Sequence, residues 1–249
     1  MKVSVCLASF NGARFIDEQI ASILAQLGIN DELIIADDHS QDATRDIIQK
    51  FQDPRITVLL SSKQRGHVAS FAKAIAHATG DIIVLSDQDD IWLEGRQDII
   101  RNALADKQCA LVAGNFSCIN RSGTPLESPA SQLHPKDSAR PLSNIIGIFL
   151  GKRPYYGCAM AFRCELKSVI LPIPALVESH DLWIAMAANL TAHVKHIEQP
   201  LLAKRFHSDN LSSQARRRWP VLIQSRVKFL AALLILSYRA IRQKVNSAR

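Results

Sequence analysis

The sequence predicts an α/β fold, in which a mixed, mostly parallel sheet is flanked by helices and followed by a basic, amphipathic helical extension at the C-terminus. Short apolar runs alternate with amphipathic stretches over the first hundred residues, as in β-α-β units. The chain of 249 residues is 47% hydrophobic, which is enough to bury a sizeable core. We expect residues 1–212 to form one domain, with halves at 1–110 and 111–212, and residues 213–249 to form the extension.

Four apolar runs in the first hundred residues predict buried strands. They lie at residues 3–8, 32–37, 56–60 and 81–86. Between them, apolar side chains recur at helical spacing in three stretches, which cover 15–27, 43–51 and 71–78. Helices between consecutive strands are typical of parallel pairing, so we expect these helices to cover the sheet.

The second half of the chain has a less regular pattern. Four prolines among serine, glycine and charged residues predict a long loop over 120–145. A turn is predicted at 155–158, and a helical pattern begins again at His180. A last, long helix is predicted over 221–245.

The positive charge of the chain is concentrated at its C-terminus. The formal net charge is +7, but residues 200–249 contain 11 lysines and arginines and a single acid, whereas residues 1–199 carry a net charge of −3. A basic arm on an acidic body indicates an anionic partner. Nucleic acid is disfavoured as that partner, because the arm lacks interleaved aromatic residues and a base-reading motif.

The predicted C-terminal helix has an apolar side and a basic side. Its uninterrupted apolar run, 229–236, is far shorter than the roughly 20 residues needed to span a bilayer. We therefore expect residues 216–245 to lie on the cytoplasmic face of the inner membrane as a peripheral helix attracted to anionic lipid. A helix docked on the domain, or in an oligomer interface, is the alternative that the pattern leaves open.

The cysteines and the first residues indicate a cytoplasmic protein. The five cysteines show no C-x-x-C pair, and their odd number argues against a disulfide framework. Residues 1–10 are too few and too polar for a signal peptide and are better explained as a buried strand. We therefore expect no export.

A cluster of carboxylates follows the fourth predicted strand. Asp87 and Asp89 are two residues apart, so they point the same way on an extended chain, and Asp90 follows directly. Such hard oxygen ligands suit Mg²⁺ or Mn²⁺ that carries a phosphorylated substrate. The alternative is an acidic turn that merely closes a buried strand.

A second pair of carboxylates, Asp37 and Asp38, follows the second predicted strand. They offer hydrogen-bond acceptors for the ring N–H of a pyrimidine or for a ribose hydroxyl. The nearby Ser40 and Asp42 are better explained as caps of the next helix. Ligands bind beyond the carboxyl ends of parallel strands, so we expect this pair, the loop after the first strand and the acidic cluster to converge on one edge of the sheet.

These motifs match those of a known family over about residues 3–210. The most specific of them is the run D-Q-D-D-I-W at 87–92. The others are Ser9-Phe10-Asn11-Gly12, Asp37-Asp38-His39-Ser40-Gln41-Asp42, Gly157-Cys158-Ala159-Met160, His180-Asp181-Leu182-Trp183 and Arg205-Phe206-His207. In these motifs the chain resembles the inverting family 2 glycosyltransferases, which have the GT-A fold, and among them the bacterial rhamnosyltransferase-like members.

The resemblance implies a role for each matching residue. Asp181 is expected to be the catalytic base. A metal ion, Mn²⁺ or Mg²⁺, is expected to be held by Asp87, Asp89 and His207. The site is expected to be supported by Asp90, Gly157 and Trp183. The nucleotide-sugar donor is expected to contact Ala8, Phe10, Asn11, Asp37, Asp38, Asp87 and Arg205.

The activity that the resemblance implies is metal-dependent, inverting sugar transfer. The donor would be dTDP-rhamnose or a UDP-hexose, and the acceptor a hydroxyl of a lipid-linked glycan in bacterial surface polysaccharide biosynthesis. Two residues, Phe10 and Lys204, stand where the family more commonly has tyrosine, and they bear on donor specificity.

Two other functions fit parts of the sequence. A sugar-nucleotide nucleotidyltransferase would need a glycine- and lysine-rich phosphate loop after the first strand, which Ser9-Phe10-Asn11-Gly12 does not provide. A non-catalytic nucleotide-binding scaffold of the same fold is disfavoured, because Asp87, Asp89 and Asp181 are all present.

Overall fold

Four parallel strands form the first half of the sheet. The computed structural model, which describes residues 1–127, 132–207 and 219–247, pairs them in the order β3-β2-β1-β4. Their bounds are β1 (Val3–Ser9), β2 (Glu32–Asp37), β3 (Ile56–Leu60) and β4 (Ile82–Asp87). The four strands expected from the apolar runs are therefore confirmed.

The second half of the sheet mixes directions. From β4 the order continues β8-β6-β9-β5, and β7 pairs with the C-terminal end of β6. The bounds are β5 (Ile91–Trp92), β6 (Cys109–Ile119), β7 (Pro125–Leu126), β8 (Met160–Arg163) and β9 (His193–Arg205). β8 runs antiparallel to β4 and β6, whereas β9 runs parallel to β6. The parallel β6–β9 pair brings the end of β9 beside the end of β4.

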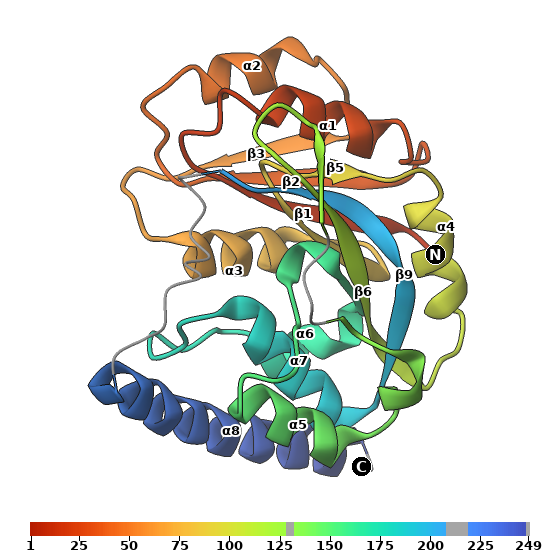
Figure 1. Ribbon diagram of the computed structural model, residues 1–249, viewed down its shortest axis with the longest axis vertical. Helices are drawn as coiled ribbons and strands as arrows, with labels where there is room; N and C mark the ends of the chain where they lie inside the picture. Colours follow the sequence, from red (N-terminus) through yellow and green to blue (C-terminus); the bar gives the residue numbers. More distant parts are fainter. Residues whose placement is uncertain (128–131, 208–218, 248–249) are drawn as a thin grey trace.

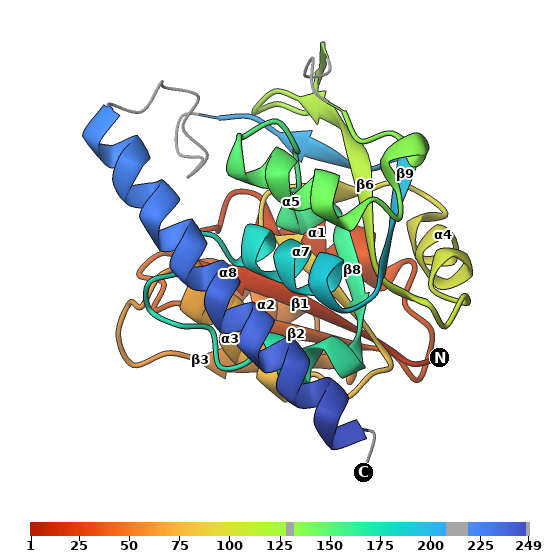
Figure 2. The same cartoon turned by 90° about the horizontal axis from the view of Figure 1, so that it is seen from below.

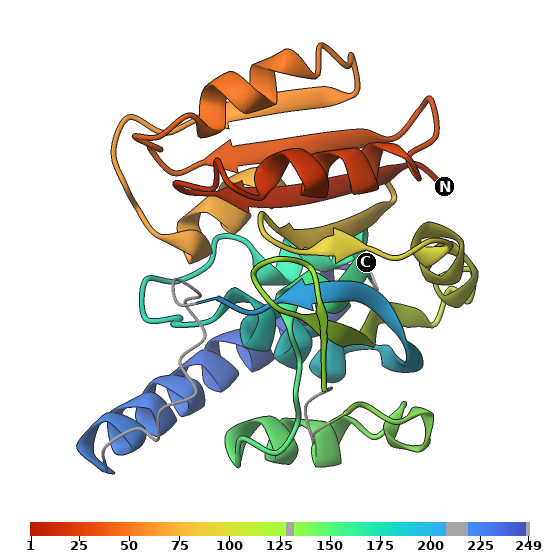
Figure 3. The same ribbon diagram turned by 45° about the horizontal axis from the view of Figure 1, so that its top comes forward.

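Helices cover both faces of the sheet (Figure 1). One face is covered by α1 (Ile16–Leu24), α2 (Thr44–Lys50) and α4 (Arg96–Ala103), and Figure 3 shows α1 and α2 across the parallel strands. The opposite face is covered by α3 (His67–His77), α6 (Lys167–Ile170) and α7 (His180–Thr191). Successive residues of β1 alternate between the two cores, with Val5 and Leu7 in one and Cys6 in the other. The fold is thus the expected mixed α/β sheet between helical layers.

The segment expected to be a long loop contains regular structure. β7 lies in it, a short 3₁₀ turn covers Pro135–Asp137, and α5 (Pro141–Phe149) begins at its last proline. Proline is well tolerated at the first position of a helix, because its missing N–H has no intrahelical partner there. The loop expected over 120–145 is therefore wrong in its second half, and residues 128–131 lie outside the described residues.

The last helix, α8 (Trp219–Ser247), lies along the outside of the domain, across α7 and α6 (Figure 2). Its inner side buries Ala232, Leu236 and Ala240. Arg239 Nη1 donates hydrogen bonds to the carbonyl oxygens of Val169 and Pro172 at 3.0 Å. α8 is therefore docked on the domain through its middle and C-terminal part, whereas Trp219 and Ile223 near its start are exposed.

The helix α8 is also more apolar than its central run indicates. Residues Trp219–Val245 are long and apolar enough, by length and composition, to cross a membrane, and 11% of the most apolar window is buried against the domain. The expectation that the helix is too short to span a bilayer counted only 229–236. It missed the apolar residues on both flanks.

Candidate functional site

The loops at the carboxyl ends of β1, β2 and β4 are tied together by side chains. Gln88 forms two hydrogen bonds with the backbone of Phe10, accepting from its N–H at 2.8 Å and donating to its carbonyl oxygen at 3.0 Å. Asn11 joins the loop after β2, because its side-chain oxygen accepts from the N–H of Gln41 at 2.8 Å. A Cβ on Gly12 would overlap the end of the Gln88 side chain, so Gln88 would have to move away from Phe10 if position 12 carried a side chain. The expected convergence at one edge is present.

Asp37 and Asp38 are both buried at this edge. Asp37 accepts hydrogen bonds from the hydroxyls of Ser9 and Ser40 and from Arg45 Nε at 2.7 Å. Burial opposes ionisation of Asp37, but the bonds from Ser40 and Arg45 outweigh it and lower the pKa. These partners bind both oxygens of Asp37, so Asp37 holds the loop after β2 in place. A direct contact between Asp37 and a nucleotide stays a prediction.

Asp38 holds the loop that precedes α3. Its two oxygens accept hydrogen bonds from the backbone N–H groups of Arg65 and Gly66, at 2.8 and 2.7 Å. Ala8 is half-buried at the end of β1, and the ring of Phe10 is exposed beside it. The ends of β1 and β2 thus place the exposed ring of Phe10 beside the two buried carboxylates.

The acidic turn, which we define as residues 87–90 after β4, is held in place by a side chain of α1. Gln19 is fully buried and donates from Nε2 to Ser86 Oγ at 2.6 Å and to the carbonyl oxygen of Asp87 at 2.8 Å. Beyond the turn, His207 Nε2 lies 2.9 Å from Asp89 Oδ2. Burial, together with the charge of Asp87, raises the pKa of Asp89. Asp89 and His207 thus form a partly buried pair that suits a divalent cation.

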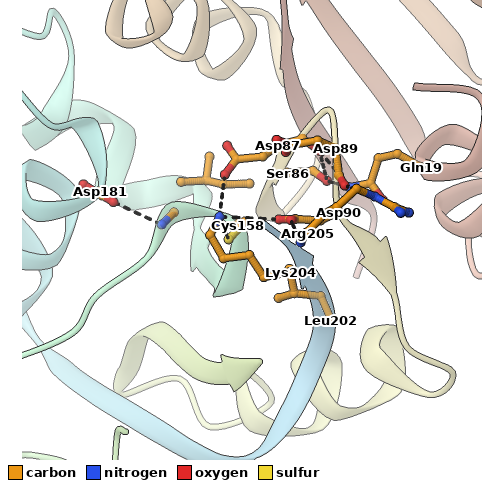
Figure 4. A network of polar contacts seen from close by, with 12 residues as sticks. Gln19, Ser86, Asp87, Asp89, Asp90, Cys158, Asp181, Leu202, Lys204 and Arg205 are labelled. Carbon is orange, nitrogen blue, oxygen red and sulfur yellow. Dashed lines mark hydrogen bonds and ion pairs between the residues drawn. The ribbon is translucent and has the colours of Figure 1, made fainter. Parts of the chain in front are cut away.

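Lys204 lies among the same carboxylates (Figure 4). Its ammonium nitrogen is 3.5 Å from Asp87 Oδ2, 3.9 Å from Asp90 Oδ2 and 3.6 Å from Cys158 Sγ. Burial raises the pKa of Asp90 to about 7, although the Lys204 charge opposes this. Burial therefore outweighs the stabilisation that the Lys204 charge gives to the Asp90 carboxylate.

Arg205 connects the end of β9 to the acidic turn. Its backbone N–H donates to Asp90 Oδ1 at 3.1 Å, and its Nε donates to the carbonyl oxygen of Asp89 at 3.0 Å. Its Nη2 also pairs with Glu18 at 2.6 Å. These contacts fix the backbone of the turn, and a direct bond from Arg205 to a bound phosphate stays a prediction.

Asp181 lies in the first turn of α7. Its Oδ1 accepts from the N–H of Leu182 at 2.8 Å and from the Ser179 hydroxyl, and its Oδ2 accepts from the N–H of Gly157 at 3.3 Å. Gly157 is followed by Cys158, whose sulfur touches Lys204. One short segment therefore joins Asp181 to the acidic turn, as Figure 4 shows.

Gly157 is needed for the close approach of this segment to α7. A Cβ on Gly157 would lie 2.7 Å from His180 Nε2. The His180 ring is buried and stacks on Phe71 at a centroid distance of 3.9 Å. The supporting position expected for Gly157 thus has a steric reason.

Trp183 does not reach the site. It is fully buried in the core, and its Nε1 donates to the carbonyl oxygen of Ile170 at 3.0 Å. Trp183 could support the site only through the packing of α7, and this role stays a prediction. Trp183 and Ile184 lie on the buried side of α7, while Asp181 faces the loop at 157–158.

Sequence reasoning missed the contributions of Gln19, Gln88 and Ser179. Gln19 had a signal, because a glutamine between Ile16 and Ile20 interrupts an apolar helical stripe. Gln88 lies inside the acidic motif, but its contacts to the loop after β1 depend on strand order. Gln88 and its partner Phe10 are 78 residues apart in the chain.

The family is decided by a match to a family model. Residues 4–165 match the model described as glycosyl transferase family 2. The chain belongs to this family. The matched range includes β1 to β8 and the acidic turn, whereas Asp181 and the end of β9 lie beyond it.

Two named relatives illustrate the sequence similarity. The chain is 31% identical over 120 residues to "UDP-Glc:alpha-D-GlcNAc-diphosphoundecaprenol beta-1,3-glucosyltransferase WfgD" of Escherichia coli, covering 48% of this chain and 47% of that protein. It is 28% identical over 219 residues to "dTDP-rhamnosyl transferase RfbG" of Shigella flexneri, covering 82% of this chain and 72% of RfbG. The match to WfgD thus spans about half the length of that relative.

Solved structures share the fold of this family 2 chain. Residues 1–349 of TarS from S. aureus, in complex with UDP-GlcNAc, superpose with a TM-score of 0.75 at 18% identity, covering 94% of this chain and 67% of that one. The mannosyltransferase PcManGT from Pyrobaculum calidifontis, in complex with GDP-Man and Mn²⁺, gives a TM-score of 0.60 at 19% identity, covering 95% and 73%. At these identities the likeness shows the fold, which is the expected GT-A type.

Proposed function

We propose that the chain is a metal-dependent, inverting glycosyltransferase, which moves a sugar from a nucleotide donor to a hydroxyl of a glycan acceptor. The observation that carries this proposal is the arrangement of Asp89 with His207 at the acidic turn, joined to Asp181 through residues 157–158. Membership of glycosyl transferase family 2 supports the same activity.

The acidic turn fits a divalent cation. A carboxylate oxygen and an imidazole nitrogen already converge at Asp89 and His207, and both donor types suit Mn²⁺ or Mg²⁺. Burial raises the pKa of Asp89 and of Asp90, and a bound cation would favour the charged form of both carboxylates. PcManGT, which shares the fold, was solved with Mn²⁺. Asp89 and His207 would hold the ion, with Asp87 alongside, and the ion would neutralise charge on the leaving diphosphate.

The other side chains supply binding and proton transfer. Phe10 offers its exposed ring to the nucleotide base, and the loops fixed by Asp37 and Asp38 surround it. Asp181 accepts the proton of the acceptor hydroxyl as that oxygen attacks the anomeric carbon. Because a single displacement from the face opposite the diphosphate forms the new bond, the anomeric centre inverts.

We test the donor site through ligand-dependent stability and turnover. The purified chain is screened by thermal unfolding with UDP, dTDP, UDP-glucose, UDP-GlcNAc and dTDP-rhamnose, with and without Mn²⁺. A ligand at 100 times its Kd is expected to stabilise the folded state by about 2.7 kcal/mol. We expect one nucleotide to raise Tm in a Mn²⁺-dependent way and to identify the donor base. Failure of every nucleotide to stabilise the chain would contradict the proposal.

The acceptor is proposed to be lipid-linked. WfgD, as its name states, acts on a sugar diphosphate carried by undecaprenol. In this chain, α8 presents a continuous exposed stripe, which we call the outer stripe and which consists of Ile223, Val227, Leu230, Leu234, Tyr238, Ile241 and Val245. The same helix carries five basic residues and no acid. Since its inner side is held by α6 and α7, the outer stripe can enter the surface of an anionic membrane without the helix leaving the domain.

Leu234→Glu is expected to weaken membrane binding about tenfold, because it removes a Leu side chain from the lipid boundary and adds a negative charge. The measurement is co-sedimentation with vesicles of phosphatidylcholine and phosphatidylglycerol. Ile29→Glu is the matched control, because Ile29 is 91% exposed and lies away from α8. Equal vesicle binding by wild type and Leu234→Glu, or a change only in oligomeric state, would refute the membrane role.

A further inference from the structure

A buried lysine occupies the acidic turn where a metal ion would be expected. Among the described residues, Asp87, Asp90 and Cys158 form a group whose ligand atoms lie within 4.8 Å of one another, close enough to hold a metal. The Lys204 ammonium group lies 3.5 to 3.9 Å from all three. Its side chain is only 7% exposed, and the Asp90 side chain is fully buried. The lysine is therefore an internal part of the turn.

A second buried cation lies behind the same group. Arg96 has no exposed surface, and its Nη2 donates to the carbonyl oxygen of Cys158 at 2.6 Å. Its guanidinium carbon lies 4.2 Å from the centre of the Trp92 ring. Two buried cations thus lie beside the Asp87–Asp90–Cys158 group before any metal ion binds, while Asp89 is paired with His207.

We propose that Lys204 is a fixed cation of the donor site. Its charge prevents a metal ion from binding to the Asp87–Asp90–Cys158 group and so restricts the divalent ion to Asp89 and His207. It also keeps a positive charge beside the diphosphate when no metal is bound. An ammonium group and a divalent ion repel each other at such short range, so both cannot share the group. The ammonium group also favours a diphosphate, which the three carboxylates alone would repel. Lys204 is a positioning residue on this view, since it acts through charge on the carboxylates and the ligand.

Mn²⁺ binding to the chain without nucleotide tests the first part. Free Mn²⁺ is counted by electron paramagnetic resonance during titration of wild type, Lys204→Met, Lys204→Arg and Lys195→Met. We expect Lys204→Met to lower the Kd for Mn²⁺ at least about tenfold, because it removes a competing charge and frees Asp87 and Asp90. Lys204→Arg keeps the charge and should stay near wild type. Lys195→Met, on the exposed part of β9, is the matched control.

Pyrophosphate binding in the presence of EDTA tests the second part without assuming a nucleotide base. Calorimetric titration should show binding to wild type and at least about tenfold weaker binding to Lys204→Met. A Kd for Mn²⁺ within twofold of wild type in Lys204→Met, or unchanged pyrophosphate binding, would overturn the proposal. A lysine that only stabilises the fold would lower Tm and leave both affinities unchanged.

Removing Lys204 takes the cation away from the buried Asp90, which is a known cause of destabilisation. If Lys204→Met does not fold, the double variant Lys204→Met with Asp90→Asn removes both charges. It is compared with Asp90→Asn alone, and relative to that variant we expect tighter Mn²⁺ binding, because Asp87 is freed, and weaker pyrophosphate binding. The inference rests on the proposed function only in taking a diphosphate as ligand. If the wild type transfers sugar but Lys204→Met binds Mn²⁺ with unchanged affinity, this inference alone is overturned. If the affinities change as expected but the wild type transfers no sugar, the proposed function alone is refuted.

Discussion

Asp181→Asn is expected to lower kcat on the order of 10²- to 10⁴-fold, the usual contribution of a general base. An asparagine has nearly the same shape, and its side-chain oxygen can still accept the hydrogen bond from the N–H of Leu182. What it cannot do is take a proton from the acceptor hydroxyl. The measurement is release of nucleoside diphosphate with saturating donor and acceptor, with Mn²⁺ affinity and donor KM expected to stay near wild type.

The matched control for Asp181 is Ser179→Ala. Ser179 caps α7, and its hydroxyl donates to Asp181, so its loss costs about 1 kcal/mol of stability without removing the base. We expect Ser179→Ala to lower Tm while keeping most of the turnover. Turnover of Asp181→Asn at the wild-type rate would show that Asp181 is only a residue of the helix terminus.

Asp89→Asn is expected to lower kcat/KM at least about 10²-fold, because a metal ion contributes several kcal/mol of charge stabilisation in the transition state. The variant loses the carboxylate nearest His207, so its Kd for Mn²⁺ should rise together with the loss of activity. The backbone of the turn should be retained, since Arg205 Nε donates to the carbonyl oxygen of Asp89, which the substitution leaves in place.

Asp98→Asn is the control for the same chemical change at an exposed position on α4. It should leave Mn²⁺ affinity and turnover unchanged. Removal of metal by EDTA from the wild type should reproduce the Asp89→Asn loss and be reversed by added Mn²⁺, whereas added Mn²⁺ should not restore the variant. Full activity of the wild type in EDTA would contradict the proposal that the acidic turn holds a metal ion needed for sugar transfer.

Local sequence patterns predicted the first half of the fold well. The strands β1, β2 and β4 are continuous apolar runs because helices cover both of their faces, whereas β3, at the edge of the sheet, is only partly buried. The strands β1, β2 and β3 are each followed directly by a helix, as expected. The start of α7 at His180 was also predicted. The helix α5 was not, because a proline that begins a helix and a proline that breaks one are the same letter in a sequence.

The site was predictable in its residues and less so in its contacts. The motifs placed Asp89 and His207 in one site, and the structure brings them to 2.9 Å. The contacts of Lys204 depend on β9 entering the sheet between β6 and β5, which no local pattern predicts. Burial of Trp183 is similarly a result of how α7 faces the sheet. Both features depend on contacts between segments that are far apart in the sequence, and local periodicity does not predict such contacts.

The parallel pairing of β9 with β6 also has a consequence for the order of events during synthesis. The three carboxylates of the turn leave the ribosome with β4, but Lys204 and Arg205 follow more than 110 residues later. Until then the turn has no counter-charge from β9, and the nascent chain lacks part of the donor site. Nucleotide-sugar binding is therefore expected to begin only after nearly the whole domain has emerged.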